Sequence, residues 1–127
     1  MKNHAGLWID RANAVIVLLN AEDEEIKHID SDTRNHPQSN GVSDNIRLSI
    51  EKEYLKQYYD EIIECVREAE SVFIFGPGEA KNQLKKRFES DGLKGKSVDV
   101  ETADKMTEAQ VAAKVKDHFH DYRNATN

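Results

Sequence analysis

The sequence predicts one α/β domain over residues 1–127, with a mixed five-stranded sheet in the order 3-2-1-4-5 and helices on its faces. Three observations predict it. Two apolar runs near the N-terminus flank a short polar turn, a long segment repeats apolar side chains at helical spacing, and two later strand-like runs each precede a helical pattern. A chain of 127 residues suits one core that needs neither disulfide nor metal.

The first strands are predicted at residues 5–9 and 14–19, which are apolar and rich in branched side chains. The polar residues 10–13 between them suit a tight turn, so the two runs read as a hairpin. After a second polar break, Ile26 and Ile29 lie in a mixed run. This run predicts a third, more exposed strand that completes a meander.

Two single residues are expected to belong to the core. Trp8 is predicted to be a core aromatic whose indole N–H finds an acceptor. Cys65 occupies an apolar position of a predicted helix beside Glu64 and Glu68, which favours a small buried side chain over a reactive thiol. A single cysteine excludes a disulfide framework and favours a reducing, intracellular setting.

Residues 31–44 have no periodicity and contain Pro37, Gly41 and several Asn, Asp and Ser residues. This stretch is too long for an ordinary connection, so we expect a mobile loop. Because long loops on rigid scaffolds often carry function, Arg34, His36 and Gln38 are candidate binding residues, and simple disorder is the alternative.

A long helix is predicted over residues 49–69, with one apolar face that packs on the sheet. Its apolar side chains follow three-and-four spacing: Ile50, Tyr54, Leu55, Tyr58, Ile62, Val66 and Ala69. Because neighbours in sequence diverge around a helix, we expect Tyr58 in the core and Tyr59 at its rim, or the reverse.

A fourth strand at residues 71–75 leads through a glycine-rich turn into a second helix, which ends near residues 91–92. Glycine lets backbone N–H groups approach an anion, and a helix N-terminus carries partial positive charge. The apolar stripe of this helix is Ala80, Leu84 and Phe88, and the basic side chains are expected on its other sides. The predicted RNA- or phosphate-binding residues are Gly76, Gly78, Lys81, Lys85, Lys86 and Arg87, against the alternative of an ordinary turn and a solvated helix face.

The last strand is predicted at residues 97–101, where Val98 and Val100 share one face. Thr107 and Gln110 then form a capping-box pattern that opens a final helix. Because right-handed helical crossovers place the later strands parallel to the first, the strand order 3-2-1-4-5 follows.

This order resembles a ribonuclease-H-like layout, in which catalysis needs carboxylates that converge on cations. The candidates are Asp10, Asp99, Glu101 and Asp104, but surface carboxylates are the simpler interpretation in this acid-rich chain. Two histidines, His118 and His120, point in different directions on a helix and lack partners for a closed zinc set. Neither a nucleophile elbow nor a complete P-loop is present, so we predict no catalytic residue, no metal and no cofactor.

The net charge of −6 opposes a general nucleic-acid-coating role, and no DNA partner is expected. Residues 81–96 nevertheless concentrate basic side chains, which predicts one positive edge on an acidic body. No apolar run approaches membrane-spanning length and the N-terminus lacks a signal-peptide pattern. We therefore expect a cytoplasmic protein without a membrane partner.

Residues 6–15, the polar loop, the long helix and residues 72–78, followed by Lys81 and Phe88, resemble the middle domain of archaeal and eukaryotic peptide-chain release factors. They also resemble the matching domain of Pelota and of bacterial stand-alone relatives. The resemblance covers residues 6–119 and implies a translational-machinery fold with a ribosome partner.

In release factors, the loop before the long helix carries a Gly-Gly-Gln motif that promotes ester hydrolysis. Here two other residues precede Gln38, and Pro37 restricts the backbone where glycine would permit unusual angles. The resemblance therefore implies a noncatalytic ribosome- or RNA-associated protein of translation termination or ribosome rescue. The alternatives are an enzyme that binds a nucleotide or phosphometabolite at residues 76–81, and a self-associating domain that forms homo-oligomers.

Overall fold

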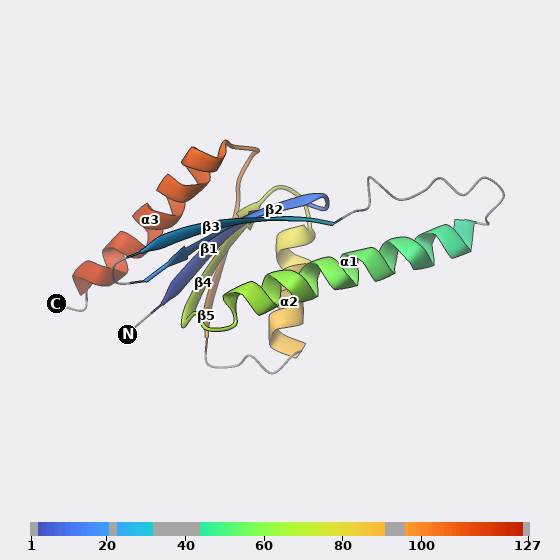
Figure 1. Ribbon diagram of the computed structural model, residues 1–127, viewed down its shortest axis with the longest axis horizontal. Coiled ribbons are helices and arrows are strands. Elements are labelled where there is room, and N and C mark those ends of the chain that lie inside the picture. Colours follow the sequence, from blue (N-terminus) through green and yellow to red (C-terminus); the bar gives the residue numbers. More distant parts are fainter. Residues whose placement is uncertain (1–2, 21–22, 32–43, 91–95, 126–127) are drawn as a thin grey trace.

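The computed structural model describes residues 3–20, 23–31, 44–90 and 96–125. A five-stranded sheet in the order β3-β2-β1-β4-β5 lies between α1 and α2 on one face and α3 on the other (Figure 1), as the sequence predicts. The elements are β1 His4–Ile9, β2 Asn13–Leu19, β3 Glu24–Asp30, α1 Asp44–Val66, β4 Ser71–Gly76, α2 Ala80–Ser90, β5 Ser97–Thr102 and α3 Glu108–Ala125.

The two hairpin turns are held by side chains of the residues that open them. The Asp10 carboxylate accepts hydrogen bonds from the backbone N–H groups of Ala12 (2.8 Å) and Asn13 (2.7 Å). The side-chain oxygen of Asn20 accepts one from the N–H of Asp23 (2.7 Å) in the same way. These turns make β1, β2 and β3 antiparallel, while β4 and β5, which follow helices, run parallel to β1.

Alternation along the strands divides the core between the two faces of the sheet. On β1, Leu7 and Ile9 face α1 and α2, whereas Trp8 faces α3. The predicted acceptor for the Trp8 indole exists, because Nε1–H donates to the backbone carbonyl of Asp104 (3.0 Å). Cys65 is only half-buried, and burial raises the pKa of its thiol.

The boundaries predicted for the long helix were wrong at both ends. α1 begins at Asp44, five residues before the predicted start. The prediction followed the apolar spacing of buried side chains, and the described side chains of the first turn and a half are exposed, so they gave no such signal. It ends at Val66, three residues early. Ala69 lies after the end of the helix, where its N–H donates to the Val66 carbonyl (3.0 Å). It is nevertheless buried, so the apolar spacing in the sequence continues past the last helical residue.

Only the C-terminal half of α1 is buried against the rest of the molecule. Among its described side chains, the fully buried ones begin at Tyr58. Tyr58 and Tyr59 are 2% and 4% exposed, so the prediction of one core and one rim tyrosine was wrong. The reason is that α1 is covered on two sides, by the sheet and by α2. Figure 1 shows the N-terminal half extending beyond the sheet.

The predicted capping box opens α3. The backbone N–H of Gln110 donates to Thr107 Oγ1 (3.2 Å), and Gln110 Oε1 accepts from the Thr107 N–H (2.8 Å). The helix lies very close to β1, since a Cβ at Gly6 would stand 2.4 Å from a methyl carbon of Val115. Four side-chain pairs join α3 to the two edge strands: Lys116 with Glu24 (2.6 Å) and Glu108 with His28 (2.8 Å) on β3, Lys114 with Glu101 (2.9 Å) and His118 with Asp99 (3.2 Å) on β5.

Candidate nucleic-acid interface

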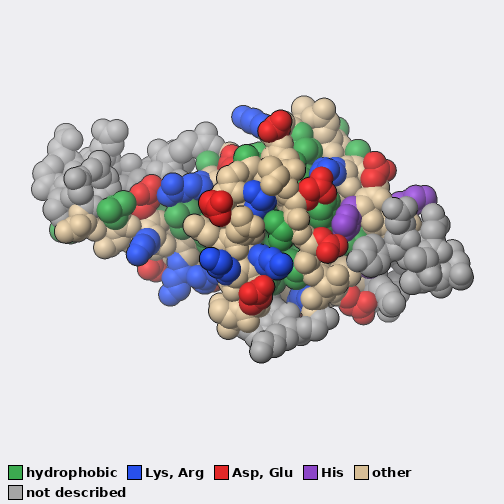
Figure 2. All heavy atoms as spheres, turned by 180° about the vertical axis from the view of Figure 1, so that it is seen from behind, with side chains coloured by type: hydrophobic (Ala, Val, Ile, Leu, Met, Phe, Trp, Pro, Cys, Tyr) green, Lys and Arg blue, Asp and Glu red, His purple; other side chains and the backbone are tan. Residues whose placement is uncertain are grey.

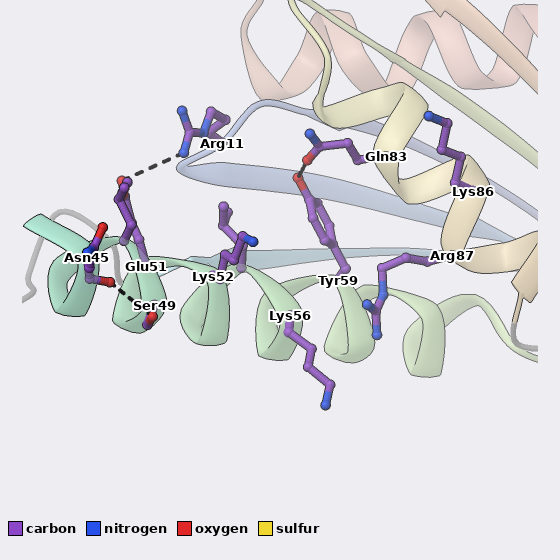
Figure 3. Close-up of a pocket in the computed structure, with 12 residues that line it drawn as sticks. Arg11, Asn45, Ser49, Glu51, Lys52, Lys56, Tyr59, Gln83, Lys86 and Arg87 are labelled. Atoms are coloured by element: carbon purple, nitrogen blue, oxygen red, sulfur yellow. Dashed lines mark hydrogen bonds and ion pairs between the residues drawn. The ribbon is translucent and has the colours of Figure 1, made fainter.

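A groove of about 820 Å³ lies between α1, α2 and the β1–β2 turn (Figure 3). Five of its lining residues are basic, and Glu51 is the acidic residue among them. Leu48 and Leu55 add an apolar part from α1. The lining residues are Arg11, Asn45, Leu48, Ser49, Glu51, Lys52, Leu55, Lys56, Tyr59, Gln83, Lys86 and Arg87.

Two side-chain contacts fix α1 against α2 and so define the width of the groove. The Tyr59 hydroxyl donates to Gln83 Oε1 (2.8 Å), and Arg87 pairs with Asp60. Burial raises the pKa of Tyr59, although the charges of Arg11 and Arg87 oppose this, so the phenol stays protonated and donates. Figure 3 shows Tyr59 reaching from α1 to Gln83 on α2.

The β1–β2 turn closes the third side. The Tyr58 hydroxyl donates to the backbone carbonyl of Asp10 (2.9 Å), and Arg11 pairs with Glu51 (3.7 Å). Asp10 and Arg11 of the turn therefore both contact α1, the first through a partly buried hydrogen bond and the second through an exposed ion pair. Since α1 and α2 are also joined, the three walls of the groove form one connected unit.

The lysines that line the groove, and Lys85 next to them in the sequence of α2, differ from most of the other cations that the structure describes. In the described ranges, Lys52, Lys56, Lys85 and Lys86 have neither an ion pair nor a hydrogen bond with another side chain or carbonyl. On α3, by contrast, both lysines pair with strand carboxylates. Figure 2 shows several Lys and Arg side chains gathered on the part of the surface near the projecting end of α1. Uncompensated positive charge is thus concentrated around one groove of a protein whose net charge is −6.

The glycine-rich turn before α2 is built by strand packing. Gly76 has φ 152°, and a Cβ there would stand 2.1 Å from the Ile9 carbonyl oxygen, so only glycine lets β4 pass β1 at this point. Lys81 is 7% exposed and its ammonium donates to the Gly78 carbonyl, so it does not lie on the exposed side of α2 as expected. The aliphatic stem of Lys81 is buried while its charged end satisfies a turn carbonyl.

The structure brings only part of the predicted basic site to the groove. Lys86 and Arg87 line it, Lys85 lies beside them on α2, and the turn residues lie outside its lining. Sequence reasoning missed Arg11, Lys52 and Lys56. The spacing of Lys52 and Lys56, four residues apart in a predicted helix, was the available signal. The loop candidates Arg34, His36 and Gln38 lie outside the described residues.

Three of the four carboxylates considered for metal-dependent catalysis have structural roles, and Asp104 contributes its backbone carbonyl to Trp8. Asp10 holds the first turn, while Asp99 and Glu101 pair with His118 and Lys114 of α3. Within residues 3–20, 23–31, 44–90 and 96–125, no three His, Cys, Asp or Glu side chains are grouped to hold a metal ion. None of the helices in this part of the chain is long and apolar enough to cross a membrane.

Comparison with solved structures identifies the fold. The Pelota protein of Thermoplasma acidophilum matches 91% of this chain with a TM-score of 0.62 and 15% identity. Pelota of Archaeoglobus fulgidus matches 98% of this chain with a TM-score of 0.59 and 14% identity. The archaeal translation termination factor aRF1 matches 95% of this chain with a TM-score of 0.49 and 17% identity. No family model and no curated protein matches the sequence. This chain spans 32% and 35% of the two Pelota chains, and it therefore has the fold of about a third of Pelota.

Proposed function

We propose that this chain is a noncatalytic, cytoplasmic ribosome- or RNA-associated protein related to translation termination or ribosome rescue. The observation that supports this proposal is the presence of three lysines without ion pairs, Lys52, Lys56 and Lys86, in the lining of the groove between α1 and α2. Lys85, which also has no ion pair, is the neighbour of Lys86 in the sequence of α2. The ribosome is the partner that the sequence resemblance to release factors and Pelota implies, and the Pelota-like fold is consistent with that resemblance. Alone, the fold would leave the function open, since one fold hosts many activities.

Polyanion binding explains why these lysines lack protein partners. Each lysine that contacts a phosphate displaces a condensed counterion, and the released ions drive binding. A lysine already held by a carboxylate would first have to break that pair. Lysines without ion pairs, such as Lys52 and Lys86, are therefore the better phosphate ligands, and the paired lysines of α3 are the poorer ones.

The turn at residues 76–81 supports the competing nucleotide-binding enzyme less well. A phosphate cradle needs a glycine backbone and a lysine that are both accessible to the ligand. Here Gly78 is exposed, but Gly76 is buried against β1 and the Lys81 ammonium donates to the carbonyl of Gly78. These residues position the start of α2, and hence Lys85 and Lys86, without facing a ligand directly.

The test is ribosome cosedimentation across a salt titration. Lys85→Glu with Lys86→Glu should weaken binding and flatten its salt dependence, because fewer counterions are released. A matched control is Lys27→Glu with Lys105→Glu, which makes the same change of net charge at exposed positions outside the groove lining. Equal ribosome binding by the wild type, the Lys85 and Lys86 double variant and the control variant would show that these lysines do not form the binding surface.

A noncatalytic protein of this kind does not release nascent peptides from the ribosome. Purified protein should leave ribosome-bound peptidyl-tRNA intact, since the two residues before Gln38 are not glycines. Hydrolysis that disappears in Gln38→Ala would contradict the noncatalytic part of the proposal and leave ribosome binding untouched.

A further inference from the structure

We infer that the groove between α1 and α2 takes single-stranded RNA, with the bases against its apolar and amide lining and the phosphates on the surrounding lysines. This inference rests on the proposed function and names the form of RNA that is bound. It is carried by the composition of the groove, which holds more than positive charge.

The apolar lining is the first reason. A surface that contacts only phosphates needs cations and hydrogen-bond donors, whereas this groove includes Leu48 and Leu55 beside Lys52. Leu48 is 57% exposed and is one of the large apolar side chains left in solvent. An unstacked base offers an apolar ring face to such a side chain and a charged backbone to the lysines around it.

The second reason is the orientation of the Gln83 amide. Its Oε1 accepts the Tyr59 hydroxyl, so its NH₂ group is directed away from the phenol (Figure 3). Within the described part of the chain this NH₂ group has no hydrogen-bond partner, and Gln83 is exposed. A fixed donor next to an apolar surface suits the carbonyl oxygens and ring nitrogens of base edges, which a single strand leaves accessible.

A duplex fits this combination poorly. The edges of paired bases lie in the grooves of the A-form helix, and the rings are stacked inside it. A duplex could contact Lys52, Lys56 and Lys86 through its phosphates. It would offer no base ring to Leu48 and no accessible base edge to the Gln83 amide. The single carboxylate of the lining, Glu51, is held by Arg11, which reduces its repulsion of a phosphate chain.

Another depression of the described surface has a different character. The groove of about 560 Å³ between β3 and α3 is lined by Glu24, Glu108 and Asp117 against one cation, Lys116. Lys116 is paired with Glu24. That surface would repel a phosphate chain, so the groove between α1 and α2 is the one assigned to RNA.

The experiment compares three probes by fluorescence anisotropy at one salt concentration, on the full chain. The probes are a single-stranded RNA of about ten nucleotides, the same sequence as a duplex, and a strand of equal length in which the central nucleotides are abasic. The single strand should bind about tenfold more tightly than the duplex, and the abasic strand should lose most of that advantage.

Two kinds of variant separate base contacts from phosphate contacts. Leu48→Ser and Gln83→Met should each weaken single-strand binding about threefold to tenfold and leave the salt dependence unchanged, while Lys52→Gln should flatten the salt dependence. Tyr59→Phe removes the same Tyr59–Gln83 hydrogen bond but keeps the amide, so it is the control for Gln83→Met and should bind the single strand like the wild type. The side chains of Leu48, Gln83 and Lys52 are at least partly exposed, and circular dichroism should confirm that the variants fold. The binding of the duplex should respond to Lys52→Gln alone.

Equal affinity for the three probes, or variants at Leu48 and Gln83 that bind like the wild type, would overturn the inference. Failure to bind any free RNA would overturn it too. Cosedimentation of ribosomes from the same preparation then decides the proposed function separately, because ribosome binding that depends on Lys85 and Lys86 would stand without single-strand recognition.

Discussion

The two faces of the sheet use lysine in opposite ways. On the α3 face, Lys114 and Lys116 reach the edge strands and pair with Glu101 and Glu24. On the other face, Lys52, Lys56 and Lys86 stand beside a groove without a carboxylate partner in the described residues. The first arrangement contributes to holding a helix on the sheet, and the second does not. The difference teaches that the same residue type either joins two elements or stays available to a ligand, according to whether a carboxylate of the protein compensates its charge.

The largest expected effect tests whether both faces are needed for the fold. Ile62 of α1 and Val115 of α3 are fully buried on opposite faces. Ile62→Asp and Val115→Asp should each destabilise the protein by about 3–5 kcal/mol, because each buries an unpaired charge. Urea denaturation measures this, with Lys56→Asp as an exposed control on α1. A wild-type midpoint for Val115→Asp would show that α3 is not part of the cooperative unit.

The next effect tests the close contact that is special to the α3 face. Gly6→Ala places a Cβ 2.4 Å from Val115, so it should destabilise by about 1–3 kcal/mol through overpacking. Val115→Ala in the same chain should recover part of this loss, since the clashing methyl groups are gone. A double-mutant cycle measures the coupling. Additive effects of the two substitutions would mean that the contact is not where the structure places it.

On the opposite face, a buried tyrosine should make stability depend on alkaline pH. Burial raises the pKa of Tyr58, and the charge of Asp10 adds to the shift. The unfolded chain loses the proton near pH 10 while the folded chain keeps it, so stability is full below about pH 10 and falls above it by up to about 1.4 kcal/mol per pH unit. Tyr58→Phe should make this fall shallower than in the wild type, because it removes the buried phenol. Identical slopes would contradict the burial of the phenol.

The smallest effect separates the two kinds of lysine directly. Lys114→Gln and Lys116→Gln should each cost at most about 1 kcal/mol of stability, because surface ion pairs contribute little. Lys52→Gln and Lys86→Gln should leave stability within about 0.5 kcal/mol of the wild type or raise it slightly, since they remove charges that have no partner. Thermal denaturation at low salt gives the widest separation. Destabilisation by Lys86→Gln larger than that by Lys116→Gln would reverse the comparison.

The sheet was predictable because its signals are local. Turn residues such as Asp10, alternation at Val98 and Val100, and the Thr107 capping box each act within a few positions. Helix ends were less predictable, as α1 shows, because the described side chains of its first turns are exposed and its apolar spacing continues to Ala69 after the helix has ended.

The candidate site was only partly predictable because it depends on how separate elements meet. Lys86 and Arg87 were found from their local concentration, but Arg11 in the first turn and Lys52 on α1 join them only when the helices pack. The role of Lys81 was missed because a lysine beside a glycine turn looks available in the sequence, while in the fold its ammonium is used by a carbonyl of that turn.

The uneven burial of α1 gives its two halves different local stability. Backbone hydrogen bonds of the half that starts at Tyr58 can open only with the core, whereas in the projecting half none of the described side chains is fully buried, so its hydrogen bonds can open without the core. Amide hydrogens around Lys52 should therefore exchange with solvent much faster than those around Ile62. A polyanion bound to both Lys52 and Lys56 would slow that exchange, because the ligand binds the closed helix better than the open one. Binding in the groove and protection of these amide hydrogens should therefore rise together as the ligand concentration rises.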